Sequence, residues 1–164
     1  SDALPPSGPA RPVAGTPFDF TTPHRIGARI GAADAQLITG NGYDHNFLID
    51  RAPADDLAVA ARLRAPKSGR VLEICATQPG IQFYSSNGLA GGPVGKGGCV
   101  YGAHSSLALE PQHFPDSPNH PEFPSTLLRP GDEYRSRTLY RFSTSPYPAS
   151  ARFSIHSSSI DPPT

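Results

Sequence analysis

Three polar side chains, those of Asp44, Gln82 and Glu110, each lie beside an apolar segment or a turn that could hold them in place. A carboxylate can act as a general base, or it can accept two hydrogen bonds at once from neighbouring hydroxyl groups. An amide can both donate a hydrogen bond and accept one. Glu110 ends an apolar run, and the six prolines between it and Gly131 stiffen the loop that follows. These residue types would suit proton abstraction by Glu110, with ligand binding by the other two.

Each of these residues also has a plain structural interpretation. Glu110 could be a solvated loop carboxylate, since most glutamates are exposed. Asp44 could cap the turn that precedes an apolar run, and Gln82 could present its amide to solvent from a strand. A general base needs a carboxylate that is held rigidly and partly desolvated, so that its pKa rises toward neutrality. The residue types alone leave both interpretations open.

A metal site, as in a cupin-like β-barrel enzyme, is a second chemical interpretation. Imidazole and carboxylate ligands would suit iron, manganese or zinc. The spacing does not support such a site, because His113 and His120 are seven residues apart in a proline-rich loop and no H-x-H or H-x-x-x-H pair occurs. We therefore expect these histidines to pack in the loop or to face solvent, and we expect no metal and no other cofactor. The residues considered are Asp44, His45, His113, Asp116, His120 and Glu122.

Composition limits both the partners and the fold. Fourteen basic and fourteen acidic residues cancel, so no basic stripe is present to attract nucleic acid or an anionic membrane. No apolar run approaches the roughly 18 residues that span a bilayer. Cys75 and Cys99 are expected to be free thiols. The many prolines and glycines alternate with short apolar runs, which is typical of a β protein with ordered loops.

Short strands at turn-marked intervals predict an all-β sandwich or barrel without a long helix. The clearest unit is a β-hairpin, with arms at residues 57–64 and 70–77 and a five-residue connection that contains Pro and Gly. Residues 34–42 are interpreted as a loop. Further strands are expected at residues 81–85, 105–109 and 133–142.

The chain divides into three regions by composition. Residues 1–15 are rich in Pro, Gly and Ala and are interpreted as an N-terminal arm or loop. Residues 16–143 contain the predicted strands and form the sandwich region. Residues 144–164 are rich in Pro and Ser and are expected to form a weakly packed tail.

Three motifs carry a resemblance: G-Y-D-H-N-F at residues 42–47, P-G-I-Q-F-Y at 79–84 and L-E-P-Q-H-F-P-D at 109–116. In this order, and with similar segments over most of residues 13–143, they resemble the C-terminal half of the aldose 1-epimerase (galactose mutarotase) family. The resemblance implies an all-β fold that is part of a large antiparallel β-sandwich, the supersandwich of that family.

The resemblance also implies a role for each candidate residue. Glu110 would be the general base that removes a proton from the sugar, and Asp44 and Gln82 would bind its hydroxyl groups. The implied reaction interconverts the α and β anomers of free aldohexoses, such as galactose or glucose, by acid–base ring opening. The sequence departs from the family at Pro111, where a threonine is usual, and at Ser86, where a glycine is usual. These departures bear on the position of the base and on the turn after Gln82.

The same resemblance leaves two other functions open and implies that an N-terminal half is absent from this chain. The chain could be a non-catalytic carbohydrate-binding relative, or a hexose-6-phosphate mutarotase, whose site would need arginines for the phosphate. The family's acid and sugar-binding histidines belong to an N-terminal half, and neither His24 nor His104 lies in a matching motif. The sequence has no methionine, so Ser1 is not a translation start. We therefore expect a companion fragment or chain with the N-terminal half, and a cytoplasmic location is favoured over a periplasmic or secreted one.

Overall fold

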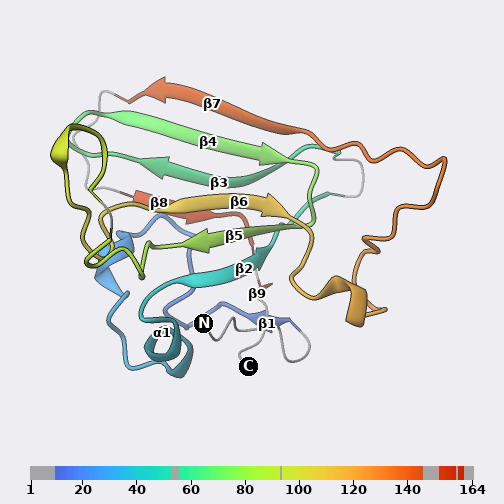
Figure 1. Ribbon diagram of the computed structural model, residues 1–164, viewed down its shortest axis with the longest axis horizontal. Coiled ribbons are helices and arrows are strands. Elements are labelled where there is room, and N and C mark those ends of the chain that lie inside the picture. The colour runs from blue at the N-terminus through green and yellow to red at the C-terminus, as the bar shows by residue number, and fades with distance from the viewer. Residues whose placement is uncertain (1–9, 53–55, 93, 146–151, 158, 161–164) are drawn as a thin grey trace.

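The chain folds into two antiparallel sheets (Figure 1). The computed structural model describes residues 10–52, 56–92, 94–145, 152–157 and 159–160. The first sheet has the strand order β1-β9-β2-β5-β6, and the second has the order β7-β4-β3-β8. The predicted all-β class is therefore confirmed. The strands are β1 (Arg11–Pro12), β2 (Asp44–Leu48), β3 (Ala58–Arg64), β4 (Arg70–Ala76), β5 (Gly80–Tyr84), β6 (Ala108–Gln112), β7 (Thr138–Thr144), β8 (Arg152–Ile155) and β9 (Ser159–Ile160).

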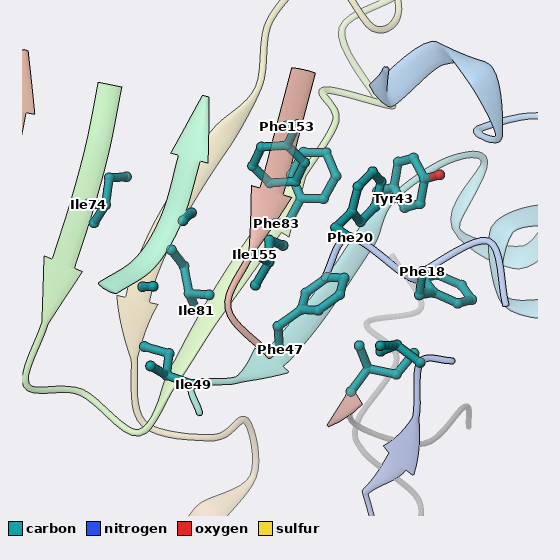
Figure 2. Close-up of a cluster of buried hydrophobic side chains, with 14 of the residues drawn as sticks. Phe18, Phe20, Tyr43, Phe47, Ile49, Ile74, Ile81, Phe83, Phe153 and Ile155 are labelled. Carbon is teal, nitrogen blue, oxygen red and sulfur yellow. The ribbon is translucent and has the colours of Figure 1, made fainter. Parts of the chain in front are cut away.

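An aromatic core joins the two sheets (Figure 2). Phe83 of β5 in the first sheet and Phe153 of β8 in the second have ring centroids 4.6 Å apart. Phe20, from the segment before β2, lies 5.0 Å from Phe153 and packs edge-on against it. All three side chains are at most 1% exposed. Full burial of an aromatic side chain of this size stabilises the fold by about 1.5–3 kcal/mol.

The predicted hairpin is confirmed as β3 and β4, with residues 65–69 as its connection. The backbone N–H of Ala65 donates to the carbonyl of Arg70, and that of Gly69 donates to the carbonyl of Ala65. Gly69 has a φ of +68°, and an added Cβ there would lie 2.9 Å from the carbonyl oxygen of Ser145. Glycine is therefore required at this turn for both its conformation and its close approach to the end of β7.

The interpretation of residues 34–42 as a loop is wrong, because α1 spans Ala35–Gly40. The Asp34 carboxylate accepts a hydrogen bond from the backbone N–H of Gln36, and Asn41 ends the helix in a left-handed conformation. Three single turns of 3-10 helix complete the helical content of the described residues, and no helix among them is long and apolar enough to cross a membrane. These turns are η1 (Ile26–Ala28), η2 (Lys96–Gly98) and η3 (Ser117–Asn119).

Two predicted strands exist but lie further along the chain than expected. The strand expected at residues 105–109 is β6 at Ala108–Gln112, so Glu110 lies inside the strand and not at its end. The strand expected at residues 133–142 is β7 at Thr138–Thr144. The ladder with β4 sets this position, since β7 pairs with β4 from Ala76↔Thr138 to Arg70↔Thr144.

The expectation of a weakly packed C-terminal tail is wrong for the part that the structure describes. β8 pairs with β3 through Leu63↔Phe153, and Phe153 and Ile155 are each 1% exposed. β9 pairs with both β1 and β2, and Ile160 is 2% exposed. The alternation of apolar and polar residues in R-F-S-I directs the two apolar side chains into the core. The rest of the predicted tail, residues 146–151, 158 and 161–164, lies outside the described residues.

The predicted N-terminal arm is also wrong for its described part. Arg11 and Pro12 of β1 pair with β9, and Val13 is 1% exposed. Residues 1–9 lie outside the described residues. Cys75, which is buried in β4, and the exposed Cys99 are both free.

Candidate active site

Asp44, Gln82 and Glu110 lie on the same face of the first sheet, which we call the polar face. Their strands β2, β5 and β6 are neighbours in that sheet (Figure 1). Gln82 is the direct cross-strand partner of Glu110 on one side and of Asn46 on the other. Side chains alternate along a strand, so Asp44 shares the face of Asn46. This is the face turned away from the aromatic core, because Phe47, Ile81 and Phe83 at the alternate positions are buried.

A hydrogen bond links the two predicted sugar-binding residues. Nε2 of Gln82 donates to Oδ1 of Asp44 over 2.8 Å. The bond fixes the orientation of both side chains on the sheet face. Asp44 and Glu110 therefore lie on either side of one amide, an arrangement that presents two carboxylates and a donor–acceptor group to a ligand with several hydroxyl groups.

Glu110 is exposed, so the partial desolvation expected of a general base is not present in this chain. Among the described strands, β6 pairs only with β5 and therefore forms an edge of its sheet. An edge strand leaves one row of its backbone N–H groups unpaired, which is why Pro111 is tolerated within β6. Pro111 keeps its place in the ladder opposite Ile81. The replacement of the family's threonine by Pro111 thus leaves Glu110 in register with Gln82.

His45 points away from the site although it follows Asp44 directly. It is 6% exposed, and its ring centroid lies 4.5 Å from that of Phe18. Burial lowers the pKa of His45 to about 4, and the nearby Asp34 carboxylate opposes this shift only in part. Nδ1 of the ring accepts a hydrogen bond from the backbone N–H of Asp44 over 2.9 Å. His45 is therefore a neutral core residue that braces the backbone beneath Asp44.

The residues considered for a metal site do not gather into one. Asp44 and His45 lie on opposite faces of β2, and neither belongs to the proline-rich loop after β6. In that loop, Nδ1 of His120 lies 2.9 Å from Oε1 of Glu122, and its ring stacks on Phe123. No group of three or more His, Cys, Asp or Glu side chains in the described part of the chain is arranged to hold a metal ion.

Ser86 adopts the backbone conformation that a glycine would favour. Its φ is +54°, in the left-handed region, two residues after the end of β5. Its hydroxyl oxygen lies 2.7 Å from that of Ser106, in the segment that leads into β6. Ser86 therefore makes this turn in a conformation that glycine adopts readily.

Two open pockets lie beyond the ends of the polar face. One, of about 350 Å³, is lined by residues 30–32, by residues of α1 and the following turn, and by His104. The other, of about 340 Å³, lies where β5 begins and β6 ends. Asp44, Gln82 and Glu110 line neither pocket. The second pocket is lined by Arg51, Thr77, Gln78, Pro79, His113, Pro124, Tyr134, Arg135 and Ser136.

Asn46 is a residue of this face that was not singled out from the sequence. It is only 2% exposed, although it lies on the same side of β2 as the exposed Asp44. Its distance of two residues from Asp44 is the signal that could have found it, because such residues share a face once the segment is a strand.

The fold and the polar face together define a class of protein. It is an antiparallel β-sandwich whose sheet, on the side away from the core, carries two carboxylates and an amide in neighbouring strands. The profile of the family described as aldose 1-epimerase matches residues 1–141. The chain belongs to the aldose 1-epimerase family.

Curated relatives and a solved structure agree with this assignment. The chain is 44% identical to the galactose mutarotase of Mus musculus over 142 residues, which are 87% of this chain and 40% of that protein. It is 44% identical to the aldose 1-epimerase of Escherichia coli K12 over 132 residues, which are 79% of this chain and 37% of that protein. The crystal structure of a GalM/aldose epimerase homologue from C. elegans superposes with a TM-score of 0.73 at 33% identity, over 85% of this chain and 40% of that chain. The chain thus spans about two fifths of the length of these relatives.

Proposed function

We propose that this chain carries the base and part of the sugar site of an aldose 1-epimerase, with free aldohexoses such as galactose or glucose as substrates. The proposal rests on one observation. Glu110 is the cross-strand partner of Gln82, and Gln82 is hydrogen-bonded to Asp44. The names of the relatives, galactose mutarotase and aldose 1-epimerase, support the reaction. They do not favour a sugar phosphate or a loss of catalysis.

The reaction needs a base and an acid that act together. The Glu110 carboxylate takes the proton of the anomeric hydroxyl, whose oxygen then forms the carbonyl as the bond from C1 to the ring oxygen breaks. An acid donates a proton to that ring oxygen, and rotation about the C1–C2 bond presents the other face of the aldehyde. Reclosure returns both protons and gives the other anomer. Asp44 and Gln82 hold the remaining hydroxyl groups, so that C1 stays beside Glu110.

The acid is proposed to come from polypeptide that the described residues do not include. His45 faces the core, Nδ1 of His104 lies 3.1 Å from the carbonyl oxygen of Ser85, and His120 pairs with Glu122. None of these three rings is placed to protonate a sugar bound between Asp44 and Glu110. The exposure of Glu110 points the same way, because a second wall over this face would desolvate the base.

An exposed apolar strip on β7 supports the proposal of a companion polypeptide. The companion would contain the part of the relatives that this chain does not match. Tyr140 and Phe142 lie opposite Ile74 and Leu72 of β4, on the side of the second sheet that forms the core. They are nevertheless 49% and 78% exposed. In the described part of the chain β7 is also an edge strand, and an edge strand can pair with a further strand. We call Tyr140 and Phe142 the β7 strip and propose that the companion covers it.

The test is polarimetry of freshly dissolved α-D-galactose and α-D-glucose, together with native mass spectrometry of the same preparation. We expect accelerated mutarotation from a species heavier than the 17.3 kDa chain. A lone 17.3 kDa species with full activity would contradict the companion and place the acid within this chain. Sugar binding without acceleration in a complete assembly would identify a non-catalytic binding protein, and no binding at all would refute the sugar site.

A further inference from the structure

Asn46 has a buried amide that finds no hydrogen-bond partner among the residues that the structure describes. Its side chain is 2% exposed, and neither Oδ1 nor Nδ2 is bonded to any group in the described part of the chain. A buried polar atom without a partner typically costs about 1–3 kcal/mol. An asparagine in this position therefore destabilises the fold, and an apolar residue of similar size would give a more stable chain.

Gln82, which lies next to Asn46, has an unpaired hydrogen-bond acceptor. Asn46 and Gln82 are direct cross-strand partners, and such residues have Cβ atoms about 4.5–5.5 Å apart. Oε1 of Gln82 is buried and also lacks a partner, while Nε2 of Gln82 is committed to Asp44. Two direct cross-strand partners thus hold an unpaired donor, Nδ2, and an unpaired acceptor, Oε1, which are not bonded to each other in the structure.

We propose that Asn46 is a positioning residue, which donates from Nδ2 to Oε1 of Gln82 and thereby sets which end of the Gln82 amide faces Asp44. A glutamine amide that is turned over would present its oxygen to the Asp44 carboxylate and would repel it. With Oε1 held by Asn46, Nε2 faces Asp44 and keeps that carboxylate in place for a sugar hydroxyl. Asn46 acts through Gln82 and does not touch the sugar. This inference rests on the proposed function for its effect on sugar binding, but not for the hydrogen bond itself.

The surroundings of Asn46 keep its amide beneath the polar face. An added Cβ at Gly80 would lie 2.5 Å from Oδ1 of Asn46 and 3.0 Å from the ring of Phe114. Gly80 thus leaves the space that the Asn46 side chain occupies, and Phe114, which follows β6, lies beside it. The side chain is enclosed beside Gly80 and Phe114, next to its cross-strand partner Gln82.

The first test reads the hydrogen bond in the wild-type chain by NMR. We expect a through-hydrogen-bond coupling between the Asn46 side-chain nitrogen and the side-chain carbonyl carbon of Gln82, and slow hydrogen exchange of the Asn46 amide. Rapid exchange without coupling would overturn the proposal. This arm needs neither a sugar nor a variant, so it decides the matter even if the proposed function fails.

The second test uses Asn46→Asp and measures galactose affinity as a function of pH. At neutral pH the new carboxylate cannot donate to Oε1 of Gln82, and we expect the amide to turn over and the affinity to fall about tenfold, in line with the loss of one hydrogen bond. Below the pKa of the new acid its hydroxyl can donate, so the affinity should recover toward that of the wild type. An unchanged affinity at neutral pH would overturn the proposal.

Asn87→Asp is the matched control. Asn87 is also buried, at 8% exposed, but its Nδ2 donates to the carbonyls of Gly40 and Tyr43 outside the polar face. We expect this variant to lose stability while the side-chain amide resonances of Gln82 keep their wild-type positions. If Asn87→Asp shifted the Gln82 resonances as strongly as Asn46→Asp does, the effect would be general and the positioning role would be refuted.

Discussion

Gln82 and Glu110 are direct cross-strand partners in the ladder between β5 and β6, on the face of the sheet away from the core. Gln82 also donates to Asp44 in the strand on its other side. One amide therefore separates the proposed base from the proposed binding carboxylate. Because backbone ladders fix the register of all three strands, the spacing of these groups does not depend on the loops that connect them.

Replacement of Gln82 by glutamate should make sugar binding depend strongly on pH. Gln82→Glu would place a third carboxylate between Asp44 and Glu110, and the three negative charges would repel one another. We expect weaker galactose binding at pH 7 than in the wild type, with partial recovery as the pH falls and the added charge is neutralised. Calorimetric titration at several pH values checks this. Gln36→Glu in α1 is the control, and an equal loss of affinity in that variant would contradict the site.

The buried His45 should make the chain less stable in acid. Its pKa is about 4 in the folded state, against an ordinary value of 6.5. The unfolded chain therefore binds the proton more readily between these values, and the free energy of unfolding should fall by about 3 kcal/mol as the pH drops from 6.5 to 4. Urea denaturation across this range measures the effect.

His45→Asn isolates the contribution of this one group. Asparagine can still accept from the backbone N–H of Asp44, but it does not titrate, so the dependence of stability on pH should flatten. His120→Asn is the control in the loop after β6. An unfolding free energy whose slope with pH is the same in His45→Asn as in the wild type would contradict the assignment.

Removal of the Phe153 ring should destabilise the chain severely. Phe153 is 1% exposed and packs on Phe20 and Phe83, and a buried Phe→Ala change typically costs about 3–5 kcal/mol. Phe142→Ala is the matched control, because this ring is 78% exposed and its loss should change the stability of the isolated chain by about 0.5 kcal/mol or less. Chemical denaturation of both variants checks this. Equal losses in the two would contradict the described packing of β8.

Phe142→Ala should have its own effect on assembly. If the companion covers the β7 strip, truncation of this ring removes apolar contact area there, while the chain itself stays folded. We expect a weaker association between the chain and its companion in native mass spectrometry. Undiminished association would place the companion on another surface.

The two cysteines should differ sharply in reactivity. Cys99 is exposed and Cys75 is buried, and both are free. Iodoacetamide should therefore modify Cys99 alone in the folded chain, and Cys75 should react only after denaturation. Peptide mass mapping identifies the modified residue. Rapid labelling of Cys75 under native conditions would contradict its burial in β4.

Most strands could be predicted from the sequence, but the packing of the two chain ends could not. The hairpin of β3 and β4 could be predicted because Pro66 and Gly69 mark its turn between two apolar arms. Helix α1 could not, since six residues give no helical period and only the Asp34 cap signals it. β8 was missed because R-F-S-I is short and lies in a Pro- and Ser-rich context. Its place in the core is decided by contact with Phe83, which is distant in sequence.

The residues of the candidate site could be predicted from local motifs, but their arrangement depends on contacts between segments that are distant in sequence. Motifs identified Asp44, Gln82 and Glu110, but only the strand register places them on one face. The exposure of Glu110 follows from the edge position of β6, which no local pattern reveals. The same holds for Asn46, whose burial depends on Gly80 in the neighbouring strand and on the Phe114 loop.

The central claim, that Glu110 is the base, is tested most directly by polarimetry of Glu110→Gln in the complete active assembly. The amide keeps the size of the side chain but cannot take a proton, so the rate of mutarotation should fall by about 10²–10⁴-fold, while galactose affinity changes little. Glu133→Gln is the control, because this exposed carboxylate pairs with Arg135 outside the polar face and its loss should leave the rate unchanged. A Glu110→Gln assembly that retains most of the wild-type rate would contradict the account.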